Sequence, residues 1–198
     1  MDECQDLNIL NIRERLERYS FINENNLKFD QNKYRKAAVL VLLVCIEGEW
    51  NLLFTKRSDS LRNHKGQVSF PGGAKEVLDK DIITTALREA QEEIGITRGN
   101  ITIIGCMSEF LTISDYAVTP VVAVMDWPIP LSISEDEVSK VFTIPIKWLQ
   151  QPGIYEEKVY THPSGAFGTV IFFNCYEGEL LWGISAKITL ELVNEILK

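Results

Sequence analysis

The stretch from Phe70 to Ile96, FPGGAKEVLDKDIITTALREAQEEIGI, constrains the fold more than any other part of the chain. It begins with Pro71-Gly72-Gly73, and we expect an irregular loop there because paired glycines supply positive φ angles and close backbone approach. It ends at Gly95, a residue type common just past the last helical turn. Between them the sequence predicts an amphipathic helix of about four turns. Asp79 and Asp81 both suit its N-terminus, as caps and as charges that complement the helix dipole.

The predicted helix has an apolar side and an acidic side. At about 100° per residue, its apolar residues fall on one side and predict the core-facing stripe: Ile83, Ala86, Leu87, Ala90 and Ile94. Glu89, Glu92 and Glu93 stand at i, i+3 and i+4, so their carboxylates converge. Three such charges repel one another unless a divalent cation lies between them, and Mg²⁺ prefers oxygen ligands shared with substrate phosphates. The alternative is a solvated acidic face; the glycine loop, Arg88 and Gly95 favour the metal site.

These residues resemble the Nudix box. From Gly73 to Ile96 the chain has a glycine, an acid at fixed spacing, Arg-Glu-x-x-Glu-Glu-x-Gly and an aliphatic residue. Two features depart from the general pattern: Asp79 stands where the box has glutamate, and the spacer from Asp79 to Arg88 is one residue longer. Both departures resemble the coenzyme A pyrophosphatase branch of the family.

A second motif, LLFTKRSDSLRNHKGQVSFPGG from Leu52 to Gly73, is similar to the coenzyme A signature of that branch. In outline the signature is Leu-Leu-x-x-x-Arg-Ser, then Arg, then Gly, then Phe-Pro-Gly-Gly. The segment carries four cationic or donor side chains, and the arginine fork suits phosphate oxygens. The alternative is ordinary solvated loop charge. The four are Arg57, Arg62, His64 and Lys65, and the substrate-binding candidates are Arg57, Arg62, His64, Gly72 and Gly73.

The resemblance implies a metal-dependent hydrolase. Mg²⁺ or Mn²⁺ would be held by Glu89, Glu92 and Glu93, with the Gly73 carbonyl completing the coordination. The cation would neutralise the inert diphosphate, orient it for in-line attack and lower the pKa of a bound water. Glu92 is the preferred base, and Arg88 is expected to pair with Asp79 or Glu76. The catalytic candidates are therefore Arg88, Glu89, Glu92 and Glu93.

The substrate implied by the resemblance is coenzyme A or acyl-coenzyme A, cleaved to 3′,5′-ADP and (acyl-)4′-phosphopantetheine. One rival is a Nudix hydrolase of another nucleoside diphosphate derivative, such as ADP-ribose, NADH or an oxidised nucleotide. The other is a catalytically silent Nudix-fold binding module. Loss of box carboxylates would mark that module, and here all three are present.

The rest of the chain predicts an α+β fold with a mixed sheet between helices. The Nudix resemblance likewise implies an α/β/α sandwich. We assign residues 1–35 to an N-terminal helix and linker, packed on or near a Nudix domain at residues 36–198. The expected elements are a helix at Leu7–Tyr19, a polar linker at Asn23–Lys36, a last helix after Trp182, and strands at Lys36–Ile46, Trp50–Lys56, Gln67–Phe70, Ile101–Phe110 and Tyr116–Met125.

Three groups of residues keep two interpretations each. Glu135 or Glu137 would bring a further carboxylate over the acidic helix, or would form an acid-rich helix N-terminus. His162 lies in a turn sequence, where histidine is more often solvated than catalytic. The last group consists of aromatic residues that would line a pocket or belong to the core: Tyr155, Tyr160, Phe167 and Phe172.

Composition restricts the classes of binding partner and of cellular location that we expect. A net charge of −8 argues against a nucleic-acid binder, although it leaves a small anionic ligand open. Cys4, Cys45, Cys106 and Cys175 show no paired spacing, so we expect neither a zinc site nor disulfides, and reduced thiols in a cytosol. The N-terminus is acidic where a signal peptide would be basic, and no apolar run is long enough to span a membrane. We therefore expect a cytoplasmic enzyme, monomeric or homodimeric, with a small-molecule substrate.

Overall fold

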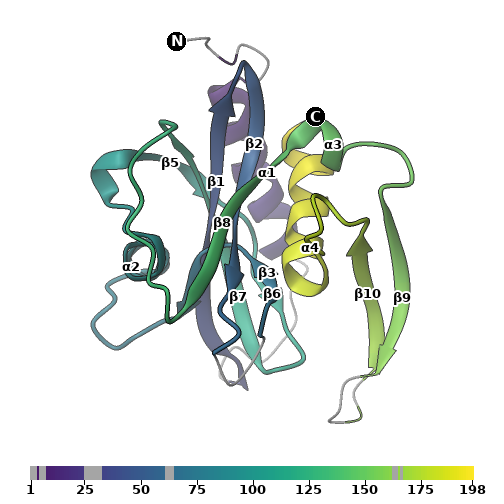
Figure 1. Cartoon of the computed structure of the whole chain (residues 1–198). Coiled ribbons are helices and arrows are strands. Elements are labelled where there is room, and N and C mark those ends of the chain that lie inside the picture. Colours follow the sequence, from purple (N-terminus) through teal and green to yellow (C-terminus); the bar gives the residue numbers. More distant parts are fainter. Residues whose placement is uncertain (1–3, 5–7, 25–32, 61–64, 162–164, 166) are drawn as a thin grey trace.

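The structure, a computed structural model, describes the chain except for residues 1–3, 5–7, 25–32, 61–64, 162–164 and 166 (Figure 1). Its elements in chain order are α1 Ile9–Glu24, β1 Arg35–Ile46, β2 Glu49–Arg57, β3 Val68–Ser69, β4 Gly72–Ala74, α2 Ile82–Ile94, η2 Arg98–Asn100, β5 Ile101–Cys106, β6 Phe110–Leu111, β7 Tyr116–Met125, β8 Val138–Pro145, α3 Ile146–Leu149, β9 Tyr155–Thr161, β10 Phe167–Phe173, α4 Gly183–Glu191 and η3 Leu192–Ile196.

The central sheet is mixed, with eight strands. Its main path runs β3-β2-β1-β7-β5, while β4 pairs with β1, β6 with β7 and β8 with β2. Only the β1–β7 pair is parallel among the described strands, in register from Arg35 opposite Tyr116 to Val44 opposite Met125. β9 and β10 form a separate two-stranded antiparallel sheet. The valine- and leucine-rich sequence of β1 suits its central place, because both of its faces are covered.

Two apolar cores lie on the two faces of the sheet. On one face Leu40 and Leu42 pack with Ala90 and Ile94 of α2. On the other face alternate residues of the same strands pack with α1 and α4, as Leu16 and Ile188 show. Figure 1 shows α2 on one side of the sheet and α1 and α4 on the other. The expected α+β fold, an α/β/α sandwich around a mixed sheet, is confirmed.

Several boundaries differ from the sequence prediction. The first helix is α1, Ile9–Glu24, so it continues into the expected linker. The expected glycine loop contains a short strand, β4, which pairs antiparallel with Ala37 to Val39 of β1. The predicted strand at 101–110 divides into β5 and β6, which pair with different parts of β7. For β4, β5 and β6, pairing with distant strands overrides the local signal.

The expectation of unpaired cysteines is wrong for two of the four. Cys4 and Cys45 form a disulfide across 41 positions, with Cα atoms 5.9 Å apart, while Cys106 and Cys175 are free. The pairing depends on Cys4 lying beside Cys45 near the end of β1, which cysteine spacing does not reveal. None of the described helices is both long enough and apolar enough to cross a lipid bilayer.

Candidate active site

Helix α2 begins and ends at residues with the expected capping roles. The Asp81 carboxylate accepts hydrogen bonds from the Thr84 amide, at 2.7 Å, and from its hydroxyl, at 2.8 Å. Gly95 adopts the left-handed conformation, with φ 74°, and its amide donates to the Gln91 carbonyl. Of the predicted core stripe, Ala86, Ala90 and Ile94 are fully buried, and Ile83 and Leu87 are half-buried. The acidic side of the helix therefore has a fixed direction.

The paired glycines bring the β4 backbone against that acidic side. A Cβ added to Gly73 would lie 2.4 Å from the carboxyl carbon of Glu89. A Cβ on Gly72, where φ is +155°, would lie 2.3 Å from the Ala38 carbonyl oxygen. The Ala38 carbonyl belongs to the backbone, so position 72 requires glycine, whereas a side chain at position 73 would displace the Glu89 carboxylate. The Glu89 carboxylate consequently lies directly on the glycine backbone.

Glu93 is a buried carboxylate with few hydrogen-bond donors and cations around it to offset the loss of hydration. It is 3% exposed, accepts one hydrogen bond from the Gly72 amide at 3.2 Å, and lies 3.9 Å from Nη1 of Arg57. Burial raises its pKa to about 8, against the opposing effects of the Gly72 amide and Arg57. Removal of a carboxylate from water is costly unless a cation replaces the lost hydration. Glu93 therefore suits a site that receives positive charge from outside the chain.

Glu89 and Glu92 share one guanidinium nitrogen. Nη1 of Arg88 lies 2.9 Å from Oε1 of Glu89 and 3.0 Å from Oε2 of Glu92. Burial raises the pKa of Glu89 although Arg88 opposes that change, whereas the Glu92 side chain is 54% exposed. Of the three box acids, two are withdrawn from solvent and one faces it.

Arg88 fixes the loop before α2 to the helix. Its Nε and Nη2 each lie 3.1 Å from a different oxygen of Asp79, and Nη2 also donates to the Ala74 carbonyl at 3.0 Å. The predicted pairing of Arg88 with an acid of this loop is confirmed, with Asp79 as the main partner and Glu76 at 3.9 Å. The hydrogen bonds from Arg88 lower the pKa of Asp79 to about 2. Asp79 thus acts as a structural carboxylate within the box.

A fourth acid reaches the site from the segment 132–137. The Ser132 and Ser134 amides donate to the last carbonyls of α2, at 3.2 and 2.9 Å, which holds the segment against the end of the helix. The charge of Glu137 raises the pKa of both Glu89 and Glu93, while Glu135 is exposed. The alternative of an acid-rich helix N-terminus is wrong, because these residues form a turn into strand β8. The sequence predicts either Glu135 or Glu137 at this place, and the turn brings Glu137 near Glu89 and Glu93.

The donors suit a hard divalent cation, but they are not yet gathered around one point. Among the described residues, no three Asp, Glu, His or Cys side chains converge as a ready metal centre. Nη1 of Arg88 accounts for part of this, since it holds Glu89 and Glu92. The residue types still fit, because Mg²⁺ and Mn²⁺ take carboxylate and carbonyl oxygens. Binding would therefore exchange Arg88 contacts for contacts with the cation.

The predicted substrate segment is described only in part. Arg57 lies at the acid cluster, the name used below for Glu89, Glu92, Glu93 and Glu137. Lys65 is exposed, while Arg62 and His64 fall outside the described residues. His162 also falls outside them. No histidine role is therefore assigned from the structure.

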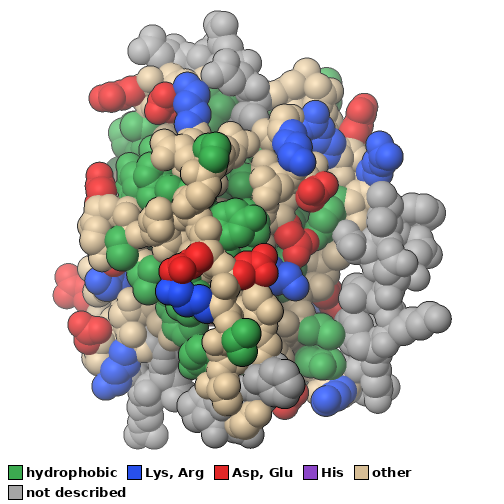
Figure 2. Space-filling model, turned by 90° about the vertical axis from the view of Figure 1, so that its right-hand side faces the viewer, with side chains coloured by type: hydrophobic (Ala, Val, Ile, Leu, Met, Phe, Trp, Pro, Cys, Tyr) green, Lys and Arg blue, Asp and Glu red, His purple; other side chains and the backbone are tan. Residues whose placement is uncertain are grey.

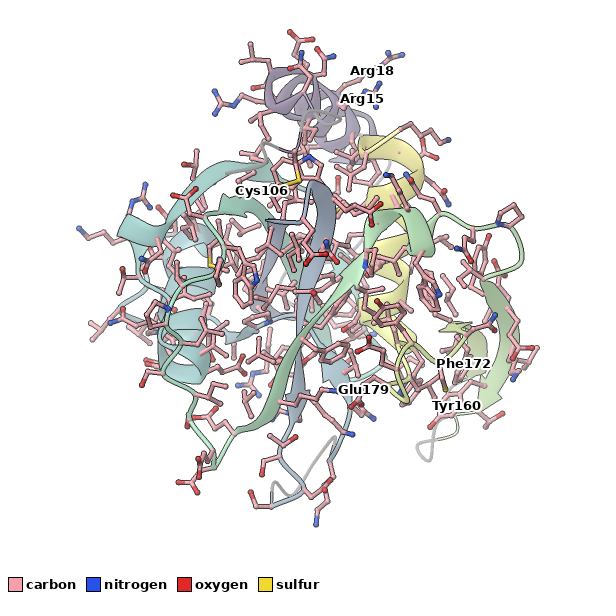
Figure 3. The ribbon with its side chains drawn as sticks, turned by 45° about the horizontal axis from the view of Figure 1, so that its top comes forward. Arg15, Arg18, Cys106, Tyr160, Phe172 and Glu179 are labelled. Atoms are coloured by element: carbon pink, nitrogen blue, oxygen red, sulfur yellow. A yellow bond between two sulfur atoms is a disulfide. The ribbon has the colours of Figure 1, made fainter. Side chains whose placement is uncertain are left out.

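The aromatic residues near the C-terminus belong to the β9–β10 hairpin and its neighbours. Phe172 stacks on Trp182 with ring centres 5.5 Å apart, and Tyr160 lies 6.0 Å from the same ring. Figure 3 shows Tyr160 and Phe172 together on the hairpin, on the α4 side of the sheet and away from α2. Figure 2 shows that this side carries acidic, basic and hydrophobic groups in mixture. Tyr155 packs on Phe173, and the Phe167 side chain is outside the described part. The described aromatic rings therefore lie away from the acids.

Comparison with known proteins agrees with this geometry. The NUDIX domain model matches residues 34–163. A protein of Escherichia coli O7:K1, named uncharacterized Nudix hydrolase NudL, is 38% identical over 167 residues, which cover 82% of this chain and 83% of that protein. The protein of that name from Yersinia pestis Pestoides F is 35% identical, covering 82% and 80%.

Among solved structures, a MutT/nudix family protein from Enterococcus faecalis superposes with a TM-score of 0.54. The superposition covers 94% of this chain and 72% of the Enterococcus faecalis protein, with 17% sequence identity, and so supports the fold alone. The family match, the relatives and the box geometry agree, and the chain belongs to the Nudix hydrolase family.

Proposed function

We propose that the protein hydrolyses the diphosphate bond of coenzyme A or acyl-coenzyme A, giving 3′,5′-ADP and (acyl-)4′-phosphopantetheine. The observation that carries the proposal is the meeting of two motifs at one place. Arg57, from the segment that resembles the coenzyme A signature, lies 3.9 Å from Glu93 of the Nudix box. A cation-binding acid cluster beside an arginine fork is suited to a bound diphosphate.

Mg²⁺ or Mn²⁺ is part of this proposal. Glu89 and Glu93 would hold it, with Glu92 and the Gly73 carbonyl as further ligands. The fit rests on the burial of Glu93 and on the close approach of Glu89 to Gly73. When bound, the cation supplies charge neutralisation at the diphosphate and a water of lowered pKa.

The protein side chains perform the remaining steps. Arg57 would bind a non-bridging phosphate oxygen and orient the diphosphate for in-line attack. Glu92 is the proposed base, which takes the proton of the attacking water on its carboxylate, and Glu137 is a second candidate because its charge acts on Glu89 and Glu93. Arg88 is proposed as a positioning residue that holds the loop, through Asp79, against the helix.

The division of the chain also belongs to the proposal. Residues 36–198 would form the catalytic domain, with residues 1–35 as an N-terminal helix and linker packed on it. Burial of Ile12 and Leu16 of α1 supports this arrangement. So does the hydrogen bond from the Ser20 hydroxyl to the Cys106 carbonyl, at 2.9 Å.

The test is product analysis by chromatography after incubation with Mg²⁺ or Mn²⁺. Coenzyme A, acetyl-coenzyme A, ADP-ribose, NADH and 8-oxo-dGTP are offered separately, each with an EDTA control. We expect 3′,5′-ADP from the coenzyme A substrates at the highest kcat/KM, and none with EDTA. A preference for ADP-ribose or NADH would reject the coenzyme A assignment and retain a Nudix hydrolase. Absence of hydrolysis with every substrate would favour the non-catalytic binding module.

A further inference from the structure

Strands β2 and β8 pair regularly until a bulge at the end nearest the acid cluster. Lys56 lies opposite Lys140, and Arg57 lies opposite Val138, so Ser139 is the extra residue. The exposed Ser139 hydroxyl lies 3.2 Å from the Lys56 carbonyl and 3.4 Å from the Arg57 carbonyl, within reach as a donor to both. Bulges are common beside active sites, where they redirect a side chain.

The extra residue changes which face the start of β8 presents. Val138 and Val141 are three positions apart, and in a regular strand they would point to opposite faces. Here both pack in the core on the α2 side. The residue before them, Glu137, is fixed by its carbonyl, which accepts from the Ser58 amide at 2.8 Å. The bulge thus determines how the start of β8 and the end of β2 are positioned beside the acid cluster.

Arg57 lies at the centre of this arrangement. Its amide donates to the Gln67 carbonyl at 3.0 Å, and its carbonyl accepts from the Gly66 amide at 3.2 Å. Its Nη1 lies 3.9 Å from Glu93, and its buried Nε has no hydrogen-bond partner among the described residues. A buried donor without an acceptor is unfavourable and requires an explanation. An anionic oxygen bound beside Glu93 would satisfy it.

We propose that Ser139 is a positioning residue, whose hydroxyl fixes the bulge and thereby directs the Arg57 guanidinium at a phosphate oxygen of the substrate. Ser139 itself contacts no substrate in this arrangement. The inference rests on the proposed function for the identity of the diphosphate substrate. Its own content is the coupling between Ser139 and Arg57.

The test compares steady-state kinetics of the wild type with Ser139→Ala, Ser139→Thr, Arg57→Lys and the Ser139→Ala/Arg57→Lys double variant. We expect Ser139→Ala to raise KM for coenzyme A about fivefold with kcat nearly unchanged, because the Arg57 guanidinium would no longer be oriented toward the substrate phosphate. Ser139→Thr keeps the hydroxyl and should restore KM to within about twofold of wild type. The double variant should be no worse than Arg57→Lys alone, since coupled residues give non-additive losses.

Thr143→Ala is the matched control. Thr143 lies on the same strand, opposite Leu53 and away from the bulge, so loss of its hydroxyl should leave KM unchanged. The thermal unfolding temperature of every variant distinguishes misorientation of Arg57 from destabilisation of the fold. An unchanged KM in Ser139→Ala would overturn the inference, as would losses that multiply fully in the double variant.

The inference and the proposed function fail in different ways. If the wild type cleaves ADP-ribose or NADH instead of coenzyme A, the proposed substrate is wrong, and the same variants are compared on the substrate that is cleaved. If it cleaves neither, calorimetry with coenzyme A and with ADP-ribose, each with Mg²⁺, measures the coupling as Kd. Absence of binding to the wild type would overturn the inference, because Arg57 would then have no diphosphate to hold.

Discussion

Two buried glutamates on opposite faces of the sheet meet opposite electrostatic surroundings. Glu179 is 8% exposed, and two lysines lie close to its carboxylate, Lys56 at 2.9 Å and Lys140 at 3.1 Å. Burial alone would raise its pKa, but the hydrogen bonds from these lysines lower it. Glu93 is 3% exposed, and among the described residues its one cationic neighbour is Arg57, at 3.9 Å; burial raises its pKa to about 8.

The alternation of β2 produces this difference. Lys56 follows Leu52 and Phe54 toward the α4 side, where Glu179 lies on the turn before α4 (Figure 3). Arg57 follows Leu53 toward α2 and the box acids. The chain thus neutralises one buried carboxylate with its own lysines and leaves the other in a cluster of excess negative charge. Buried carboxylates without a compensating cation are typical of functional sites, where a bound cation supplies the missing positive charge.

The largest expected effect is on catalysis at Glu93 and Glu89. Glu93→Gln and Glu89→Gln should each lower kcat by about 10³-fold or more, because each removes a carboxylate from the proposed cation site. Both changes keep the size of the side chain, so the thermal unfolding temperature should stay close to that of wild type. The measurement is kcat with Mg²⁺ on the best substrate. Near-normal kcat in both variants would remove the metal assignment.

Loss of Asp79 should destabilise the fold. Asp79→Asn weakens charged hydrogen bonds to Arg88 and should lower the free energy of unfolding by about 2 kcal/mol at neutral pH. The pKa of Asp79 is lowered from 3.8 to about 2, so its contribution is full above pH 4 and is lost as the pH falls toward 2. Urea denaturation at several pH values should show a shallower acid dependence in Asp79→Asn. Equal slopes in the two proteins would contradict the pairing.

A smaller effect is expected at Glu179. Glu179→Gln leaves Lys56 and Lys140 without their carboxylate, and because both lysines are partly exposed, the loss should be about 1 kcal/mol. Activity per folded molecule should stay within about twofold of wild type, since Glu179 has no role in the proposed reaction. Urea denaturation and kcat measure the two quantities on the same sample. A large loss of kcat without destabilisation would show that the two glutamates do not differ as described.

Much of the fold and part of the site follow from local sequence. The apolar run at 36–46 and the Tyr116–Met125 segment give β1 and β7 because continuous burial is a local signal. Asp81, Gly95 and the box acids are likewise local, since capping and helical spacing act within a few residues. Arg88 and Asp79 are nine residues apart, which is close enough in sequence for their pairing to be predicted from spacing.

The features that were not predicted depend on pairing between distant segments. The β4 strand exists only because β1 accepts it, and the bulge at Ser139 is defined by β2. The Cys4–Cys45 disulfide needs the folded backbone as well, and so does the choice of Glu137 rather than Glu135 as the acid near α2. Spacing along the chain carries no information on such contacts, so Glu135 and Glu137 were equivalent in sequence.

The most direct measurement is Mn²⁺ binding by electron paramagnetic resonance, at neutral pH and without substrate, for the wild type, Glu93→Gln and Glu179→Gln. We expect the wild type and Glu179→Gln to bind Mn²⁺ with the same Kd, and Glu93→Gln to bind at least about tenfold more weakly. The proposed cation site would be contradicted if Glu93→Gln bound as tightly as the wild type, or if Glu179→Gln lost as much affinity as Glu93→Gln.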